Sequence, residues 1–196
     1  DTNIDLIHIL DADSLWHFMY EYKNLKINNN NRIILTPNKT EFQRLYKAFI
    51  SENFEPTNYD IEIKGDIVKL DFDNMKSFFI KEIELAKKLN LMIVIKGPFD
   101  IITDGTELYV VNNEGSSKRC GGTGDILSGI IGSFAGMMKK NQTTITNNDL
   151  LEMSALACYI CRELSNVAYN KYFYSLTAPD VIHELKHYTN LMKISF

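Results

Sequence analysis

The chain has 196 residues, of which 45% are hydrophobic, and its formal net charge is −4. A chain of this size can bury one sizeable core, so we expect a single domain over residues 1–196. The charges form no basic cluster, which argues against nucleic acid or an anionic membrane surface as a partner. No apolar run approaches the roughly 18 residues of a membrane-spanning helix, and the first residues lack the basic start of a signal peptide. We therefore expect a cytoplasmic protein with small-molecule partners, and we leave an organellar form and homo-oligomerisation open.

Short apolar runs alternate with helical patterns along the chain. Runs typical of strands cover residues 6–10, 32–35, 91–96, 100–103 and 107–111. Helical patterns cover residues 14–22, 38–50, 73–88, 125–140 and 146–167, and a last one opens at Pro179. Asn38 and Glu41 have the spacing of a capping box at the start of the second helix. Residues 51–65 carry few structural signals.

This order of elements predicts an α/β fold, in which a mostly parallel sheet is covered by helices on both faces. Asp104 and Gly105 favour a tight hairpin between the last two strands. Because ligands bind at the carboxyl ends of the strands in such sheets, the polar residues after each strand are expected on one rim. These polar residues are Asp11 and Asp13, residues 36–41, residues 96–100 and the glycine-rich loop that begins at residue 115.

Several residues that often carry chemistry are expected to have structural roles here. Three cysteines without the spacing of a disulfide framework indicate a reducing compartment. Cys158 and Cys161 lie inside a helical pattern with no second pair to complete a zinc site, so buried packing is expected. Phe42 and Trp16 are expected in the core rather than as cofactor platforms. The four histidines have no ligand spacing, which favours packing or surface positions.

The glycine-rich loop is the strongest local signal for function. Six of the ten glycines lie between residues 115 and 132. Gly121, Gly122 and Gly124 let the backbone approach a ligand closely, and the helix that follows points its first N–H groups at the same place, which is an anion site. The loop lacks the Lys-Ser or Lys-Thr pair of a Walker A motif. Asp125 at the helix start can accept a proton from a hydroxyl that attacks a phosphate. The alternative is that Asp125 only caps the helix and the glycines only form a turn.

Five ordered segments resemble one family. RCGGTGDILSG (119–129) and LTPNKTEFQRL (35–45) are the specific ones, and LDADSLW (10–16), VIKGPFDIITDG (94–105) and TAPDVIHEL (177–185) agree with them in order. Together they are similar to the ATP-dependent NAD(P)H-hydrate dehydratases of the ribokinase-like superfamily. Thr123 stands where the eukaryotic members of this family usually have glutamine.

The resemblance implies a fold and a reaction. The fold is the ribokinase-like three-layer α/β/α architecture, of which this chain resembles the C-terminal two thirds, so that the N-terminal part of the family fold is expected to be absent from the residues given. In the reaction, ATP phosphorylates the ring hydroxyl of the S-epimer of hydrated NADH or NADPH, and phosphate is then lost. ATP is the co-substrate, and Mg²⁺ assists the phosphoryl transfer.

The resemblance also assigns roles to individual residues. Asp125 is the catalytic base and faces the substrate hydroxyl, and Glu41 is a candidate for holding Mg²⁺ through water. The remaining hydrated-cofactor site comprises Asn38, Lys39, Thr40, Glu41, Phe42, Gln43 and Arg44. The ATP site comprises Lys96, Gly97, Pro98, Phe99, Asp100, Gly115, Ser116, Ser117, Lys118, Arg119, Cys120, Gly121, Gly122, Thr123 and Gly124.

Alternatives stay open for the residues and for the function. Asn38 and Glu41 can form a capping box alone, and Lys96 can simply extend into solvent from a buried strand. A second candidate function is another ribokinase-like small-molecule kinase, such as one acting on a vitamin precursor, which would leave a stable phosphorylated product. A third is a nucleotide-binding remnant without catalysis.

Overall fold

The computed structural model of the chain describes residues 6–24, 32–59, 61–71, 73, 77–141 and 144–192. Its strands are β1 (Ile7–Leu10), β2 (Arg32–Leu35), β3 (Ile67–Lys69), β4 (Met92–Ile95), β5 (Asp100–Thr103) and β6 (Leu108–Val111). Its helices are α1 (Asp13–Glu21), α2 (Lys39–Phe49), α4 (Ile80–Leu89), α5 (Thr123–Asn141), α6 (Asn147–Tyr172) and α7 (Ala178–Met192), with a 3-10 turn, η1, at Phe173–Ser175. Among the residues described, none of the helices has the length and apolar character needed to cross a membrane.

The six strands form one sheet in the order β1-β2-β4-β5-β6-β3. The pairings of β1 with β2 and of β2 with β4 are parallel, whereas β4–β5, β5–β6 and β6–β3 are antiparallel. The α/β class is confirmed, but the sheet is parallel only in its first half and mixed overall. The reason lies in the connections, because residues 96–99 and 104–107 are far too short for the crossover of about a dozen residues that parallel neighbours require.

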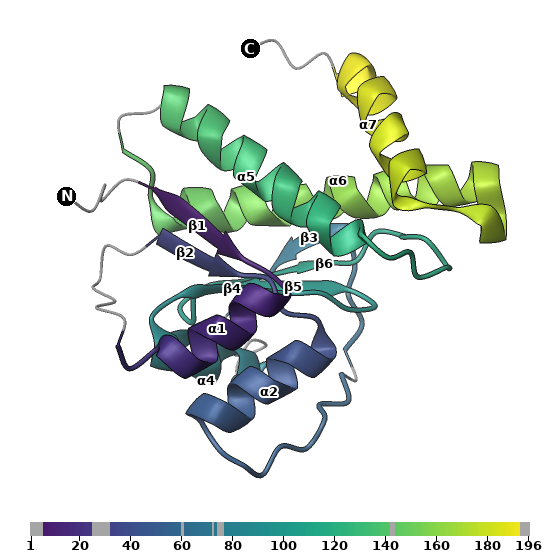
Figure 1. Ribbon diagram of the computed structural model, residues 1–196. Coiled ribbons are helices and arrows are strands. Elements are labelled where there is room, and N and C mark those ends of the chain that lie inside the picture. Colours follow the sequence, from purple (N-terminus) through teal and green to yellow (C-terminus); the bar gives the residue numbers. More distant parts are fainter. Residues whose placement is uncertain are drawn as a thin grey trace.

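Helices cover both faces of the sheet, as Figure 1 shows: α1, α2 and α4 lie on one face, α5 and α6 lie on the other, and α7 packs against α6 and points away from the sheet. The burial of strand β4 reflects this cover on both faces, since all four of its residues are buried. Met92 and Val94 pack in the core beneath α5 and α6, while Ile93 and Ile95 pack in the core beneath α1, α2 and α4. This continuous apolar run is typical of a strand inside a three-layer fold.

Most elements agree with the sequence, and the disagreements are local. The hairpin at Asp104 is confirmed, and its carboxylate accepts N–H bonds from Thr106 and Glu107. The helix expected over 73–88 is described as α4 from Ile80 onward, and residues 72 and 74–76 lie outside the described part. Strand β3 was not predicted, because it has only three residues and pairs with β6 about forty residues later.

The structural roles expected of Cys158, Cys161 and Phe42 are confirmed, since all three are buried. Burial raises the pKa of the Cys161 thiol to about 12, so this thiol stays protonated at neutral pH. Trp16 was expected in the core and is instead 39% exposed. Its ring stacks on Tyr20, one turn along α1, so it belongs to the outer face of that helix.

Candidate active site

The carboxyl ends of the parallel strands bring distant residues together, as the fold class predicts. Lys96, which follows β4, donates its backbone N–H to the carbonyl of Pro37, which follows β2, at 2.8 Å. It also forms an isolated bridge with Asn38. The Lys96 ammonium lies 2.6 Å from Asp11 Oδ1, at the end of β1. Three separate segments therefore meet at Lys96.

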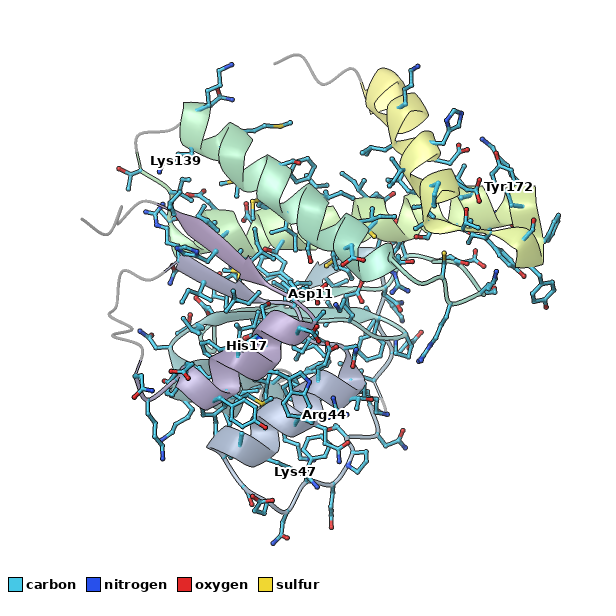
Figure 2. All side chains as sticks on the ribbon, viewed as in Figure 1. Asp11, His17, Arg44, Lys47, Lys139 and Tyr172 are labelled. Carbon is cyan, nitrogen blue, oxygen red and sulfur yellow. The ribbon has the colours of Figure 1, made fainter. Side chains whose placement is uncertain are left out.

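The Asp11–Lys96 pair lies directly against the start of α5. A Cβ placed on Gly124 would be 3.2 Å from Lys96 Nζ and 3.3 Å from Asp11 Oδ2, so a side chain here would press directly on the pair. Ser128, one turn further along α5, donates its hydroxyl to Asp11 Oδ2 at 3.2 Å. Figure 2 shows Asp11 where β1, α1 and the beginning of α5 come together. The glycine loop and the sheet are thus joined by one ion pair.

The charge of Asp11 is stabilised by its neighbours. Burial by itself favours the neutral carboxyl, but the hydrogen bond and charge of Lys96, with help from Thr36, outweigh it and lower the pKa of Asp11. The next residue, Ala12, has a φ of 49°. Such a conformation costs a non-glycine residue about 1–3 kcal/mol and often marks functional sites. The backbone is therefore held in an unfavourable conformation at Ala12, directly after Asp11.

The glycine loop enters α5 through a turn that requires glycine. Gly122 has a φ of 91°, and a Cβ there would lie 2.9 Å from the Cβ of Ala178, at the start of α7. Its carbonyl accepts the Ile126 N–H, the first bond of α5. By contrast, a Cβ on Gly121 would meet no heavy atom of the described residues within 4 Å. Gly122 is needed for packing, whereas Gly121 faces open space.

Asp125 is exposed in the first turn of α5. The built Cβ of Gly122 would lie 3.9 Å from its Oδ2, so the carboxylate is turned back toward the loop. The first N–H groups of a helix lack partners within the helix and attract anions. A carboxylate at this place adjoins the position where a phosphate would bind, which is the arrangement that a base for phosphoryl transfer needs.

Arg162, on α6, joins two other loops of the rim. Its Nε donates to the Asn113 carbonyl at 2.7 Å, and its two Nη atoms donate to the Pro98 and Gly97 carbonyls at 2.5 and 3.3 Å. It also lies 3.5 Å from Asp100 Oδ2. Burial raises the pKa of Asp100, although Arg162 and the Gly97 N–H oppose that effect. Sequence reasoning missed Arg162, because no local pattern in its helix marks it.

The segment expected to bind the hydrated cofactor forms the start of α2. The capping box is confirmed, since Asn38 accepts the Glu41 N–H and Glu41 Oε2 accepts the Asn38 N–H at 2.8 Å. Lys39 and Thr40 are exposed, Gln43 is half-buried, and Phe42 points into the core. Arg44 is exposed and lies 4.9 Å above the ring of Trp16, which belongs to the neighbouring helix α1 (Figure 2).

Some of the residues expected at the ATP site have other partners. The Lys118 ammonium donates to the carbonyls of Tyr174 and Leu176, at 2.6 and 3.0 Å, and so connects the loop to the segment before α7. The Ser116 hydroxyl bonds within the loop, to the Lys118 carbonyl. Ser117 and Arg119 are exposed. Among the described glycines of the loop, Gly124 is the one that adjoins the Asp11–Lys96 pair.

The described residues fit a magnesium ion held mainly by phosphates. Among them, no three histidine, cysteine, aspartate or glutamate side chains gather into a metal cluster. Mg²⁺ commonly takes only one or two carboxylates besides phosphates and water. Glu41 uses Oε2 in the capping box, which leaves Oε1 for such a contact, and Asp125 offers an exposed carboxylate.

The fold and this rim define a ribokinase-like α/β protein with a loop of the kind that binds anions. The chain belongs to the NAD(P)H-hydrate dehydratase family, whose profile matches residues 3–187. It is similar to the ATP-dependent (S)-NAD(P)H-hydrate dehydratase of Rattus norvegicus, at 34% identity over 184 residues that cover 92% of this chain and 48% of that protein. The same enzyme of Schizosaccharomyces pombe is 32% identical over 198 residues, covering 96% of this chain and 53% of that protein.

The chain spans about half the length of the curated relatives it matches. Among solved structures, a hypothetical protein from Streptococcus mutans superimposes with a TM-score of 0.61. That superposition covers 95% of this chain and 57% of the other, at 17% identity. This likeness shows the fold alone.

Proposed function

We propose that the protein catalyses the ATP-dependent dehydration of the S-epimer of hydrated NADH or NADPH, and thereby repairs a damaged nicotinamide cofactor. Family membership supports this activity, as do the names of the similar enzymes. The observation that carries the proposal is the position of Asp125. Its exposed carboxylate directly follows the glycine loop and lies on the same rim as Lys96.

The proposed chemistry has two steps. In the first, Asp125 takes the proton of the ring hydroxyl while the hydroxyl oxygen attacks the γ-phosphorus of ATP, and the bond to ADP breaks. In the second, the ring C–O bond breaks and inorganic phosphate leaves. A proton is lost from the neighbouring carbon, which restores the double bond. Phosphorylation converts the ring hydroxyl into a good leaving group, so that phosphate leaves in place of hydroxide.

Two separate sets of residues would bind the two substrates. The ATP phosphates would lie along residues 96–100 and the end of the glycine loop, where backbone N–H groups and the Lys96 ammonium stabilise negative charge. The hydrated cofactor would lie against residues 38–44. Mg²⁺, bound to the phosphates and to Glu41 through water, would neutralise charge that develops during transfer.

Asp125→Asn in the full-length protein tests the proposal. Turnover of hydrated NADH, followed by NADH absorbance and by phosphate release, should fall about 100-fold because the base is lost. Removing a charge from the first turn should lower stability by no more than about 1 kcal/mol. ATP affinity should be retained.

The matched control is Asp66→Asn, because Asp66 is also exposed and lies beside strand β3. It should leave turnover unchanged. If Asp125→Asn kept more than about half the parent rate, Asp125 would not be the base. A stable phosphorylated product without phosphate release would instead identify a small-molecule kinase.

A second prediction separates ATP binding from packing within the glycine loop. Gly121→Ala adds a methyl group in open space, so it should leave the melting temperature unchanged and weaken ATP about tenfold by blocking close backbone approach. Gly122→Ala should destabilise the protein by at least about 1 kcal/mol, because its φ is positive and Ala178 is too close. Equal ATP affinity in the parent and Gly121→Ala would remove the loop from the ATP site.

A further inference from the structure

A pocket of about 290 Å³ opens beside the rim, on the face of the sheet that carries α2. Its walls come from the start of α2, from residues 54–59 and from residues 95–101. Lys39 and Phe42 contribute from α2, and Lys96 and Phe99 from the opposite wall. The pocket therefore contacts both the segment assigned to the hydrated cofactor and the segment assigned to ATP.

The third wall, residues 54–59, is fixed by α4. Lys81 donates to the Glu55 carbonyl at 2.5 Å and lies 5.3 Å from the centre of the Phe54 ring. The Tyr59 hydroxyl donates to Glu82 at 2.5 Å, and its ring stacks on Phe79. The wall is thus held by hydrogen bonds and ring contacts at both of its ends. Because these contacts lie within the chain itself, the wall can act as a preorganised binding surface.

The lining has the chemistry of a site for a flat ring that carries phosphate. The side chains of Phe54, Tyr59 and Phe99 supply aromatic surface, and the buried Phe42 also borders the pocket. Two of these rings, Tyr59 and Phe99, meet edge to face at 5.2 Å. Lys39 adds positive charge at the same pocket, and Lys96, which is paired with Asp11, also lines it. Aromatic side chains stack on the flat face of any nucleobase, and ammonium groups attract phosphates.

We infer that this pocket takes the adenosine end of the hydrated dinucleotide, an inference that rests on the proposed function. Pockets for drug-sized ligands usually measure about 300–1,000 Å³, so this one can hold one end of a dinucleotide and not the whole. The reacting ring must lie at Asp125, next to Gly124. The Lys96 side chain adjoins Gly124 and also borders the pocket. The two ends of one dinucleotide can therefore lie on the two sides of Lys96.

The test compares a whole and a truncated substrate in the full-length protein. Asn58 is exposed and lines the pocket, so Asn58→Trp should fill it without disturbing the core. KM for hydrated NADH should rise about tenfold, with kcat unchanged, because base stacking is lost. KM for the hydrated reduced nicotinamide mononucleotide, which lacks adenosine, should stay within about twofold of the parent. Glu52→Trp is the control, since Glu52 is exposed on the same segment outside the pocket.

A binding measurement tests the pocket independently of turnover. ADP-ribose carries the adenosine diphosphate and lacks the reacting ring. With the ATP site saturated by a non-hydrolysable ATP analogue, calorimetry should show ADP-ribose binding to the parent and to Glu52→Trp, and about tenfold weaker binding to Asn58→Trp. Equal ADP-ribose affinity in all three proteins, or equal changes in KM for both substrates, would overturn the inference. Loss of turnover in the parent with this binding pattern intact would contradict only the proposed function.

Discussion

Two pairs of an aspartate and a cation lie on the same rim, and their aspartates behave oppositely. Asp11 and Lys96 are 2.6 Å apart, and the pKa of Asp11 is lowered. Asp100 and Arg162 are 3.5 Å apart, and the pKa of Asp100 is raised. Burial opposes ionisation in both, but Asp11 is less deeply buried than Asp100, and Lys96 is close enough to outweigh the effect of burial on Asp11. Arg162 is further from Asp100 than Lys96 is from Asp11, and it also donates hydrogen bonds to backbone carbonyls.

The difference indicates that the two cations have different tasks. Lys96 keeps a compact charge beside Gly124, at the start of α5. Arg162 is extended between the loops at residues 97–98 and 113, and its planar group suits several carbonyls at once. We therefore expect changes at Lys96 to affect catalysis most and changes at Arg162 to affect stability most.

The largest expected effect is on stability, in Arg162→Ala. This change leaves the buried Asp100 carboxyl and three carbonyls without their partner, so the free energy of unfolding should fall by about 3 kcal/mol. Urea unfolding measures it, with Lys88→Ala on the exposed side of α4 as the control. A loss below about 1 kcal/mol would mean that Arg162 does not hold the two loops.

Lys96→Met should produce the next largest effect, and it should appear in turnover. Methionine keeps the length of the side chain but removes the charge near the proposed phosphates, so turnover of hydrated NADH should fall about 100-fold. Stability should fall by about 1–3 kcal/mol, because Asp11 loses its partner.

The double variant Asp11→Asn with Lys96→Met distinguishes the two effects. It should recover most of the lost stability, since no unpaired charge remains, and it should recover no turnover. Recovery of turnover together with stability would reduce Lys96 to a structural partner of Asp11.

The sequence predicted those features that short local patterns of residues determine. Asn38 and Glu41 revealed a helix start through their spacing, and the glycines before Asp125 revealed the loop. Asp11 directly follows the first predicted strand. Because the carboxyl ends of parallel strands lie at the same edge of a sheet, the sequence predicted Asp11 at the rim. Local patterns cannot show partners, so the contacts of Asp11 with Lys96 and Ser128 had to come from the fold.

The missed parts depend on distant contacts. Arg162 lies in a long amphipathic helix, and the carbonyls it binds are about 50 to 65 residues away in the chain. The wall at residues 54–59 has no periodic pattern, because it is an irregular segment fixed by Lys81 and Glu82 on α4. Neither spacing nor hydrophobic periodicity records such contacts, so only the packed structure shows them.

The smallest expected effect is a pH dependence that differs in sign between the two aspartates. An aspartate with a lowered folded pKa contributes stability above its ordinary pKa of 3.8, and that stability is lost as the pH falls through the folded value. Asp11 should behave in this way. Asp100 has a raised folded pKa, so the unfolded state ionises first, and stability is lost as the pH rises from 3.8 through the folded value.

The measurement is the free energy of unfolding of the parent minus that of each Asp→Asn variant, between about pH 3 and 7. For Asp11→Asn this difference should grow as the pH rises, and for Asp100→Asn it should shrink. Each asparagine removes one titration and keeps the shape of the side chain, so the contributions of other groups cancel in the subtraction. Slopes of the same sign for both variants would mean that Arg162 compensates Asp100 as fully as Lys96 compensates Asp11, and the division of tasks between the two cations would not hold.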